Sequence, residues 1–141
     1  MAGSNPQIKA VLSDLRGNSK EKRRTAVMRL GMIGDDEAIQ ILITTLENEF
    51  EDLIVRGRAA MMLGRVGDIR AVAPLIRALD APGFQTPYHA AESLGRLGDP
   101  RAIVPLQSVA DNSKDKLRDV ALASLARITP VIASPEPEPE L

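Results

Sequence analysis

The sequence predicts an all-α protein in which helical hairpins stack side by side, and three observations support this fold class. A segment of 31 to 33 residues recurs. Its clearest mark is Leu63-Gly64, which has counterparts at Leu30-Gly31 and Leu94-Gly95. Each Leu-Gly pair is followed by a Gly-Asp pair at the same distance. Aromatic residues form only 2% of a chain that is 44% hydrophobic. A regular repeat with an aliphatic core is typical of helix pairs stacked into a solenoid.

The Gly-Asp pairs predict where one helix ends and the next begins. Glycine accepts the left-handed backbone that closes a helix, and an aspartate carboxylate accepts the free N–H groups at a helix start. Each pair therefore joins the two helices of one hairpin. The three pairs are Gly34-Asp35, Gly67-Asp68 and Gly98-Asp99.

The helices before and within the first hairpin follow from apolar residues at helical spacing. Residues 6–16 carry Ile8, Val11, Leu12 and Leu15 on one face, which predicts a short first helix. Ser19 is a suitable N-cap for a second helix over residues 19–32.

The second helix of a hairpin is clearest over residues 68–80, where the apolar residues follow an i, i+3, i+4, i+7 spacing. Pro74 and Pro105 occupy the position that Ile41 holds in the first copy. Proline has no backbone N–H to donate, so it should kink these helices or delay their regular part.

The two ends of the chain predict half-hairpins. A last helix over residues 114–128, capped by Asn112 or Ser113, matches the first helix of a repeat, whereas the N-terminal helix matches the second. We expect about eight helices, forming three full repeats between two halves in a domain of residues 1–128. The Pro- and Glu-rich segment 129–141 is predicted to be a disordered tail.

The last helix has no following helix to cover its apolar side. This side carries Val120, Leu122, Leu125 and Ile128. Either Val131 and Ile132 of the tail or another chain would cover it, so a homodimer through the C-terminal helix is one expectation.

Composition argues against several function classes. The net charge is −1, and three glutamates of the tail contribute −3 of it, so the body is only weakly basic at +2. Nucleic-acid binding would require clustered basic residues and stacking aromatics, so we expect no nucleic-acid partner. There is no cysteine, and no long apolar run is present at the N-terminus. We therefore expect no membrane span, no secretory signal and a cytoplasmic location.

The motif LGxxGDxxA, with an arginine seven residues before its leucine in several copies, resembles the HEAT-like repeats of phycobilisome lyases and of small bacterial and archaeal proteins. The resemblance covers residues 19–128 and implies a right-handed α-solenoid whose second helices line the concave face. It also implies a structural ladder of ion pairs, which Pro87 would interrupt because it replaces an arginine. The ladder would consist of Arg23, Arg56, Arg118, Asp35, Asp68 and Asp99.

If the second helices line a concave face, the side chains outside their apolar stripes form a small, mostly apolar strip. Such a strip suits a helix or an extended segment of a partner protein. We therefore expect a non-enzymatic protein-interaction scaffold or adaptor without a cofactor. The predicted partner-binding residues are Gln40, Ile41, Thr44, Arg70, Ala73, Pro74, Arg77, Arg101, Val104 and Ser108.

Two alternatives involve chemistry. The resemblance to phycobilisome lyases makes an accessory subunit of a bilin lyase, or of another chromophore-handling complex, the second hypothesis, although no cysteine is present to take a thioether intermediate. Deoxyhypusine hydroxylase, built from similar repeats, holds iron through several His-Glu pairs. Here His89 is the only histidine and Glu92 lies three residues later, which is too little for a two-metal site.

No nucleophile elbow or phosphate-binding loop is present, so we expect no catalytic residue and no metal.

Overall fold

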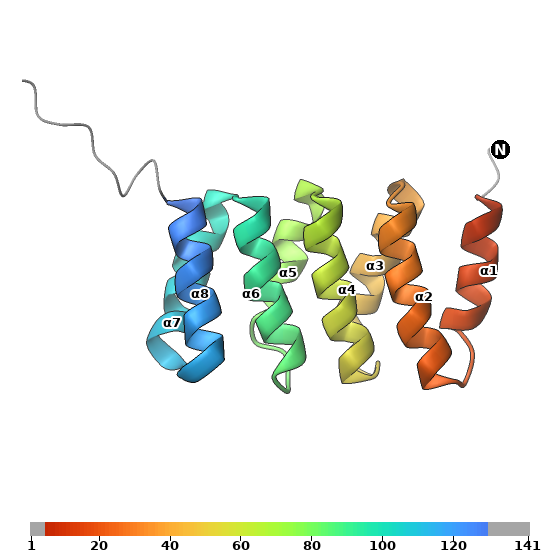
Figure 1. Cartoon of the computed structure of the whole chain (residues 1–141), viewed down its shortest axis with the longest axis horizontal. Helices are drawn as coiled ribbons and strands as arrows, with labels where there is room; N and C mark the ends of the chain where they lie inside the picture. The colour runs from red at the N-terminus through yellow and green to blue at the C-terminus, as the bar shows by residue number, and fades with distance from the viewer. Residues whose placement is uncertain (1–4, 130–141) are drawn as a thin grey trace, which may run out of the picture.

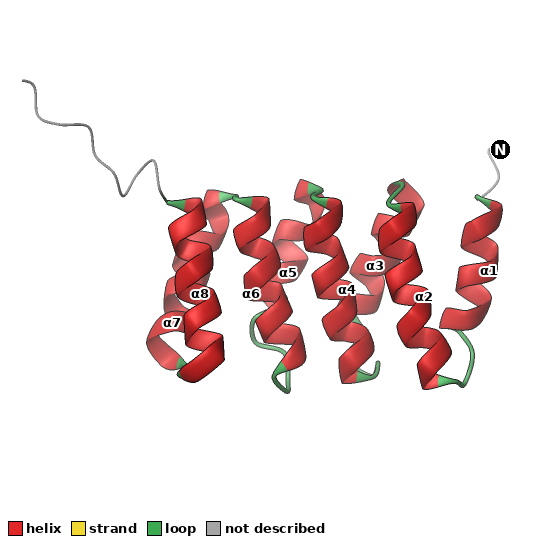
Figure 2. Cartoon of the chain, in the orientation of Figure 1, coloured by secondary structure: helices red, strands yellow, loops and turns green. Residues whose placement is uncertain are grey.

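The computed structural model describes residues 5–129, and these form two rows of helices (Figure 1). All the helices and the loops between them are distinguished in Figure 2, and no strand occurs in the described part. The first row contains α2 (Lys20–Ile33), α4 (Leu53–Val66), α6 (Gln85–Leu97) and α8 (Asp115–Ile128). The second row contains α1 (Pro6–Leu15), α3 (Asp36–Glu47), α5 (Val72–Ala78) and α7 (Ile103–Asn112). The predicted all-α solenoid is confirmed.

The three Gly-Asp joints have the predicted geometry. Gly34, Gly67 and Gly98 follow the first-row helices with φ of 61°, 80° and 69°, which is the left-handed region. Each aspartate then accepts a backbone N–H of the next helix. The donors are Ala38 N to Asp35, Arg70 N to Asp68 and Arg101 N to Asp99, each at 2.8 Å.

The two prolines delay the regular part of their helices, as predicted. In the first copy α3 begins directly after Asp35. In the later copies a short 3₁₀ turn comes first, at η1 (Ile69–Ala71) and η2 (Pro100–Ala102). Pro74 and Pro105 are then the third residues of α5 and α7, where the missing N–H has no partner to lose.

Small residues bring the first-row helices into close contact. A β-carbon added to Gly64 would lie only 2.5 Å from Ser93 Cβ. The Ser93 hydroxyl donates to Ala60 O at 2.6 Å, and Ser124 repeats this contact one repeat later with Ala91 O at 2.7 Å. A continuous aliphatic core, with Leu30, Leu63 and Leu94 fully buried, runs between the two rows.

The C-terminal helix differs from the prediction in two ways. Helix α7 extends through Asn112, whose side-chain amide donates to Ser108 O, so neither Asn112 nor Ser113 caps α8. On α8, Leu125 is buried, whereas Val120 and Ile128 are half-buried. Only Leu122, 41% exposed, remains as a large exposed apolar residue on this helix. The tail prediction concerns residues that lie, except for Thr129, outside the described part.

The predicted arginine–aspartate ladder is wrong. Arg56 and Arg118 instead donate to backbone carbonyls in the last turns of α3 and α7, where carbonyls lack helical partners and cations are favoured. Arg23 donates to a carbonyl just beyond the end of α1 and pairs with Glu51. The acceptors are Leu46 O at 3.0 Å, Ala110 O at 3.1 Å and, for Arg23, Gly17 O at 3.0 Å. Pro87 takes the corresponding place in α6, so α5 ends without such an arginine.

Candidate protein-binding surface

The exposed side of the second row contains three open grooves, one between each pair of successive helices. The α1/α3 groove has a volume of about 330 Å³, the α3/α5 groove about 440 Å³ and the α5/α7 groove about 260 Å³. We call this side the second-row face. The grooves are open because the second-row helices are not drawn together by small residues. The glycine and serine contacts that bring the first-row helices close have no counterpart among the described contacts of the second row.

Most of the predicted partner-binding residues lie in these grooves. Gln40, Ile41 and Thr44 line the first groove together with Leu12 and Leu15 of α1. Pro74 and Arg77 line the second, and Ser108 lines the third. Ala73 and Val104 are exposed on α5 and α7 without lining a groove. That the second row forms the concave side stays a prediction.

Arg70 and Arg101 lie at the edge of this face and are held by the hairpin joints. Arg70 Nη2 pairs with Asp68 at 2.9 Å and with Asp36 of the preceding repeat at 2.8 Å. Arg101 Nη2 pairs with Asp99 at 3.1 Å. Hydrogen bonds from the Arg70 side chain and backbone N–H lower the pKa of Asp68 to about 2. The same contacts from Arg101 lower the pKa of Asp99. Both arginines are thus engaged within the joints.

The α3/α5 groove contains charged residues that the sequence did not single out as partner-binding. Arg77 Nε pairs with Glu47 across the groove at 3.1 Å, and Glu49 and Asp80 line the same groove. Arg56, which contributes to the wall, is only 5% exposed, and its Nη1 has no partner among the described residues. Glu49 and Asp80 come from connectors and Arg56 comes from the first row, so the helical phase of α3 and α5 did not identify these three residues.

The pair of His89 and Glu92 does not form a larger ligand set. His89 Nδ1 lies 3.3 Å from Glu92 Oε1, and Tyr88 packs edge-on to the imidazole. Within residues 5–129, no group of three potential ligand side chains could hold a metal ion. The same part of the chain contains no helix of the length and apolarity needed to cross a bilayer.

Comparison with known protein families identifies the repeat. A family model described as HEAT repeats matches residues 8–85 and 51–126, which together span most of the chain. The chain belongs to the HEAT-repeat family. The resemblance inferred from the LGxxGDxxA motif is therefore confirmed at this level.

Solved structures contain similar HEAT-repeat folds, whereas no curated protein matches the sequence. One such structure is the complex of CpcE and CpcF of phycocyanin lyase from Nostoc sp. PCC7120, with a TM-score of 0.62 and 21% sequence identity. The match covers 93% of this HEAT-repeat chain and 69% of the other chain. At this identity the match establishes similarity of fold.

Proposed function

We propose that this HEAT-repeat protein is a non-enzymatic scaffold or adaptor that holds a segment of a partner protein along its second-row face. The observation that carries the proposal is the series of three grooves, which contains six of the predicted residues. Successive grooves on parallel helices offer repeated contacts to a helix or an extended chain laid across them. A cytoplasmic location is part of this proposal.

The test requires a partner isolated from the source cells and then purified. Thr44→Trp and Ser108→Trp would each fill a groove from an exposed position without disturbing the core. We expect each to weaken binding about tenfold or more, measured by calorimetry, which corresponds to about 1.4 kcal/mol. Thr25→Trp, at an exposed position of α2, is the matched control. Equal affinity of all three variants would contradict the proposal.

A second candidate function is an accessory subunit of a bilin lyase or of another chromophore-handling complex. The similarity in fold to a chain of the CpcE–CpcF complex favours it. Its test is the absorption spectrum of a bilin mixed with the purified protein, alone and with a candidate partner subunit. A spectral shift would support this function, and an unchanged spectrum in both mixtures would argue against it.

A homodimer through α8 remains a separate proposal. Its contact would centre on Leu122, since the other large apolar residues of α8 are at least half-buried. Light scattering of the wild-type chain and of Leu122→Lys would distinguish a monomer from a dimer. A dimer that dissociates in the variant would support it, and a wild-type monomer would refute it.

A further inference from the structure

The connector between α3 and α4 presents an aromatic side chain to solvent. Phe50 is 98% exposed, in a chain with only two phenylalanines and one tyrosine. The ring therefore makes almost no contribution to the core. Aromatic residues are enriched among the few residues that dominate protein–protein binding energy.

The backbone that carries Phe50 is held by a network of polar contacts. Asn48 Oδ1 accepts the Phe50 N–H at 3.0 Å, and Asn48 O accepts the Glu51 N–H at 3.1 Å. Glu51 Oε1 accepts the Asp52 N–H at 2.8 Å. The connector is thus folded by its own side chains, with its polar groups engaged on both sides of Phe50.

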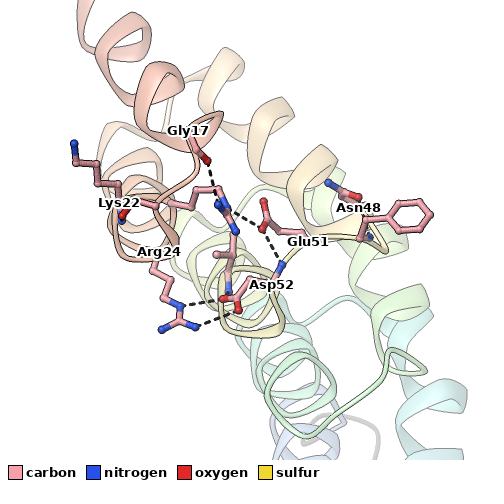
Figure 3. A network of polar contacts seen from close by, with 10 residues as sticks. Gly17, Lys22, Arg24, Asn48, Glu51 and Asp52 are labelled. Atoms are coloured by element: carbon pink, nitrogen blue, oxygen red, sulfur yellow. Dashed lines mark hydrogen bonds and ion pairs between the residues drawn. The ribbon is translucent and has the colours of Figure 1, made fainter.

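The same connector is tied to α2 of the preceding repeat. Glu51 pairs with Arg23 at 3.2 Å, and Asp52 accepts two hydrogen bonds from Arg24 at 2.9 and 3.1 Å (Figure 3). Asp52 also caps α4 by accepting the Val55 N–H. Hydrogen bonding to Arg24 lowers the pKa of Asp52. A side chain on a backbone fixed in advance loses less conformational freedom on binding.

Two further apolar residues are exposed along the edge formed by the connectors. Leu53, at the start of α4, is 42% exposed, and Phe84, just before α6, is 46% exposed. Gly83 links them, because a β-carbon placed on it would lie 3.1 Å from Leu53 Cδ1. We call Phe50, Leu53 and Phe84 the connector strip. It lies at the ends of α4 and α6 opposite the Gly-Asp joints (Figure 1).

The charges beside Phe50 are acidic, whereas Phe84 lines a pocket together with Lys114 and Lys116. Glu47, Glu51 and Asp52 each have an arginine partner, whereas Glu49 and Asp80 make no ion pair with any described residue. Glu49 precedes Phe50 in its connector, and Asp80 lies in the connector that carries Phe84; both also line the α3/α5 groove. A partner surface with basic residues would therefore be attracted to the Phe50 end of the strip, and an acidic one would be repelled there.

We propose that the connector strip is a second protein-docking surface, in which Phe50 enters an apolar pocket of a partner whose rim carries Lys or Arg. This surface borders the α3/α5 groove, whose lining includes Glu49 and Asp80, but Phe50, Leu53 and Phe84 line none of the three grooves. Because Phe50 is exposed, it has no role in stability. The polar network fixes its position. The unpaired carboxylates of Glu49 and Asp80 select the charge of the partner.

The experiment selects cyclic peptides of random sequence, displayed on phage, against the full-length chain. Selected peptides are synthesised, and their affinities are measured by fluorescence polarisation for the wild type, Phe50→Ala and Met32→Ala. Met32 is the matched control, since it is also strongly exposed, at 82%, but lies at the opposite end of the first-row helices. Circular dichroism checks that both variants keep the wild-type melting temperature.

We expect peptides rich in apolar and basic residues that lose about tenfold or more of their affinity in Phe50→Ala and none in Met32→Ala. The double variant Glu49→Gln and Asp80→Asn should weaken the same peptides and reduce the salt dependence of binding. Peptides that bind Phe50→Ala as tightly as the wild type would overturn the inference, as would selection of acidic peptides. Peptides sensitive only to Thr44→Trp or Ser108→Trp would overturn it while supporting the second-row face.

Discussion

At the scale of single residues, the contact between neighbouring first-row helices depends on residues that leave room for a backbone. Gly64 and Gly95 face Ser93 and Ser124 of the following helices. The serine hydroxyls donate to backbone carbonyls that already belong to a helix, at 2.6 and 2.7 Å. These two helix contacts therefore combine close packing with a buried hydrogen bond, whereas in the equivalent contact between α2 and α4 Gly31 faces Met62 instead of a serine.

Gly64→Ala should destabilise the protein by about 1–3 kcal/mol, because overpacking forces backbone shifts. The added methyl would lie 2.5 Å from Ser93 Cβ and 2.8 Å from Ser93 Cα, and the Cα belongs to the backbone and cannot rotate away. Chemical denaturation followed by circular dichroism measures the loss. Gly17→Ala is the control, since its added methyl would meet only carbonyl oxygens at 3.5 Å. Equal losses in the two variants would contradict this account.

At the scale of helices, the hairpin joint combines a helix stop, a helix start and a charge pair in a few residues. The stop and the start were predictable because they depend on local backbone chemistry, as Gly67 and Asp68 illustrate. The pairing of Asp68 with Arg70 was not predicted, since the family resemblance assigned the aspartates to Arg23, Arg56 and Arg118. Those arginines reach carbonyls in the preceding helix or just beyond its end.

The stability contributed by the Asp68–Arg70 pair should depend on pH in the acidic range. The folded-state pKa of Asp68 is lowered to about 2 from its ordinary value of 3.8, so the folded protein binds fewer protons than the unfolded chain between these values. This contribution is therefore complete above about pH 4 and is lost as the pH falls through about 2. Asp68→Asn keeps a capping acceptor but removes the charge.

The measurement is the difference in free energy of unfolding between the wild type and Asp68→Asn at several pH values. We expect the difference to shrink as the pH falls from about 5 to about 2. Arg70→Met removes the hydrogen bonds that are the main cause of the lowered pKa, so the same comparison in that background should depend less on pH. A difference that stays constant with pH in the wild-type background would refute the role of this pair.

At the scale of the whole molecule, the order of helices and the half-repeats at both ends followed from the sequence period. The residues of the candidate surface were only partly predictable. The helical phase placed Ile41, Pro74 and Ser108 correctly in grooves. It could not identify Arg56 or Asp80, because these reach the α3/α5 groove from a first-row helix and a connector. Whether residues of a connector or of the first row reach a groove depends on the distance between the second-row helices.

The two half-repeats are complementary, since α8 is a first helix without a partner and α1 is a second helix without one. A second copy stacked head to tail would complete a hairpin, yet the residues at the ends prevent the close joint. Ala126 and Leu122 on α8 replace Gly95 and Ala91, the residues that receive Ser124 in the preceding joint. Arg29 on α2 replaces the serine. These larger side chains would obstruct the close contact that Ser124 makes one repeat earlier.

The triple variant Leu122→Ala, Ala126→Gly and Arg29→Ser recreates the small-residue joint at the two ends and should therefore associate head to tail. Because such a contact is heterologous and does not close on itself, the mass measured by light scattering should rise continuously with protein concentration. Variants carrying only the α8 changes, or only Arg29→Ser, should not form these chains, since each supplies half of the joint. A triple variant with the same mass as the wild type at every concentration would show that something other than these three side chains terminates the stack.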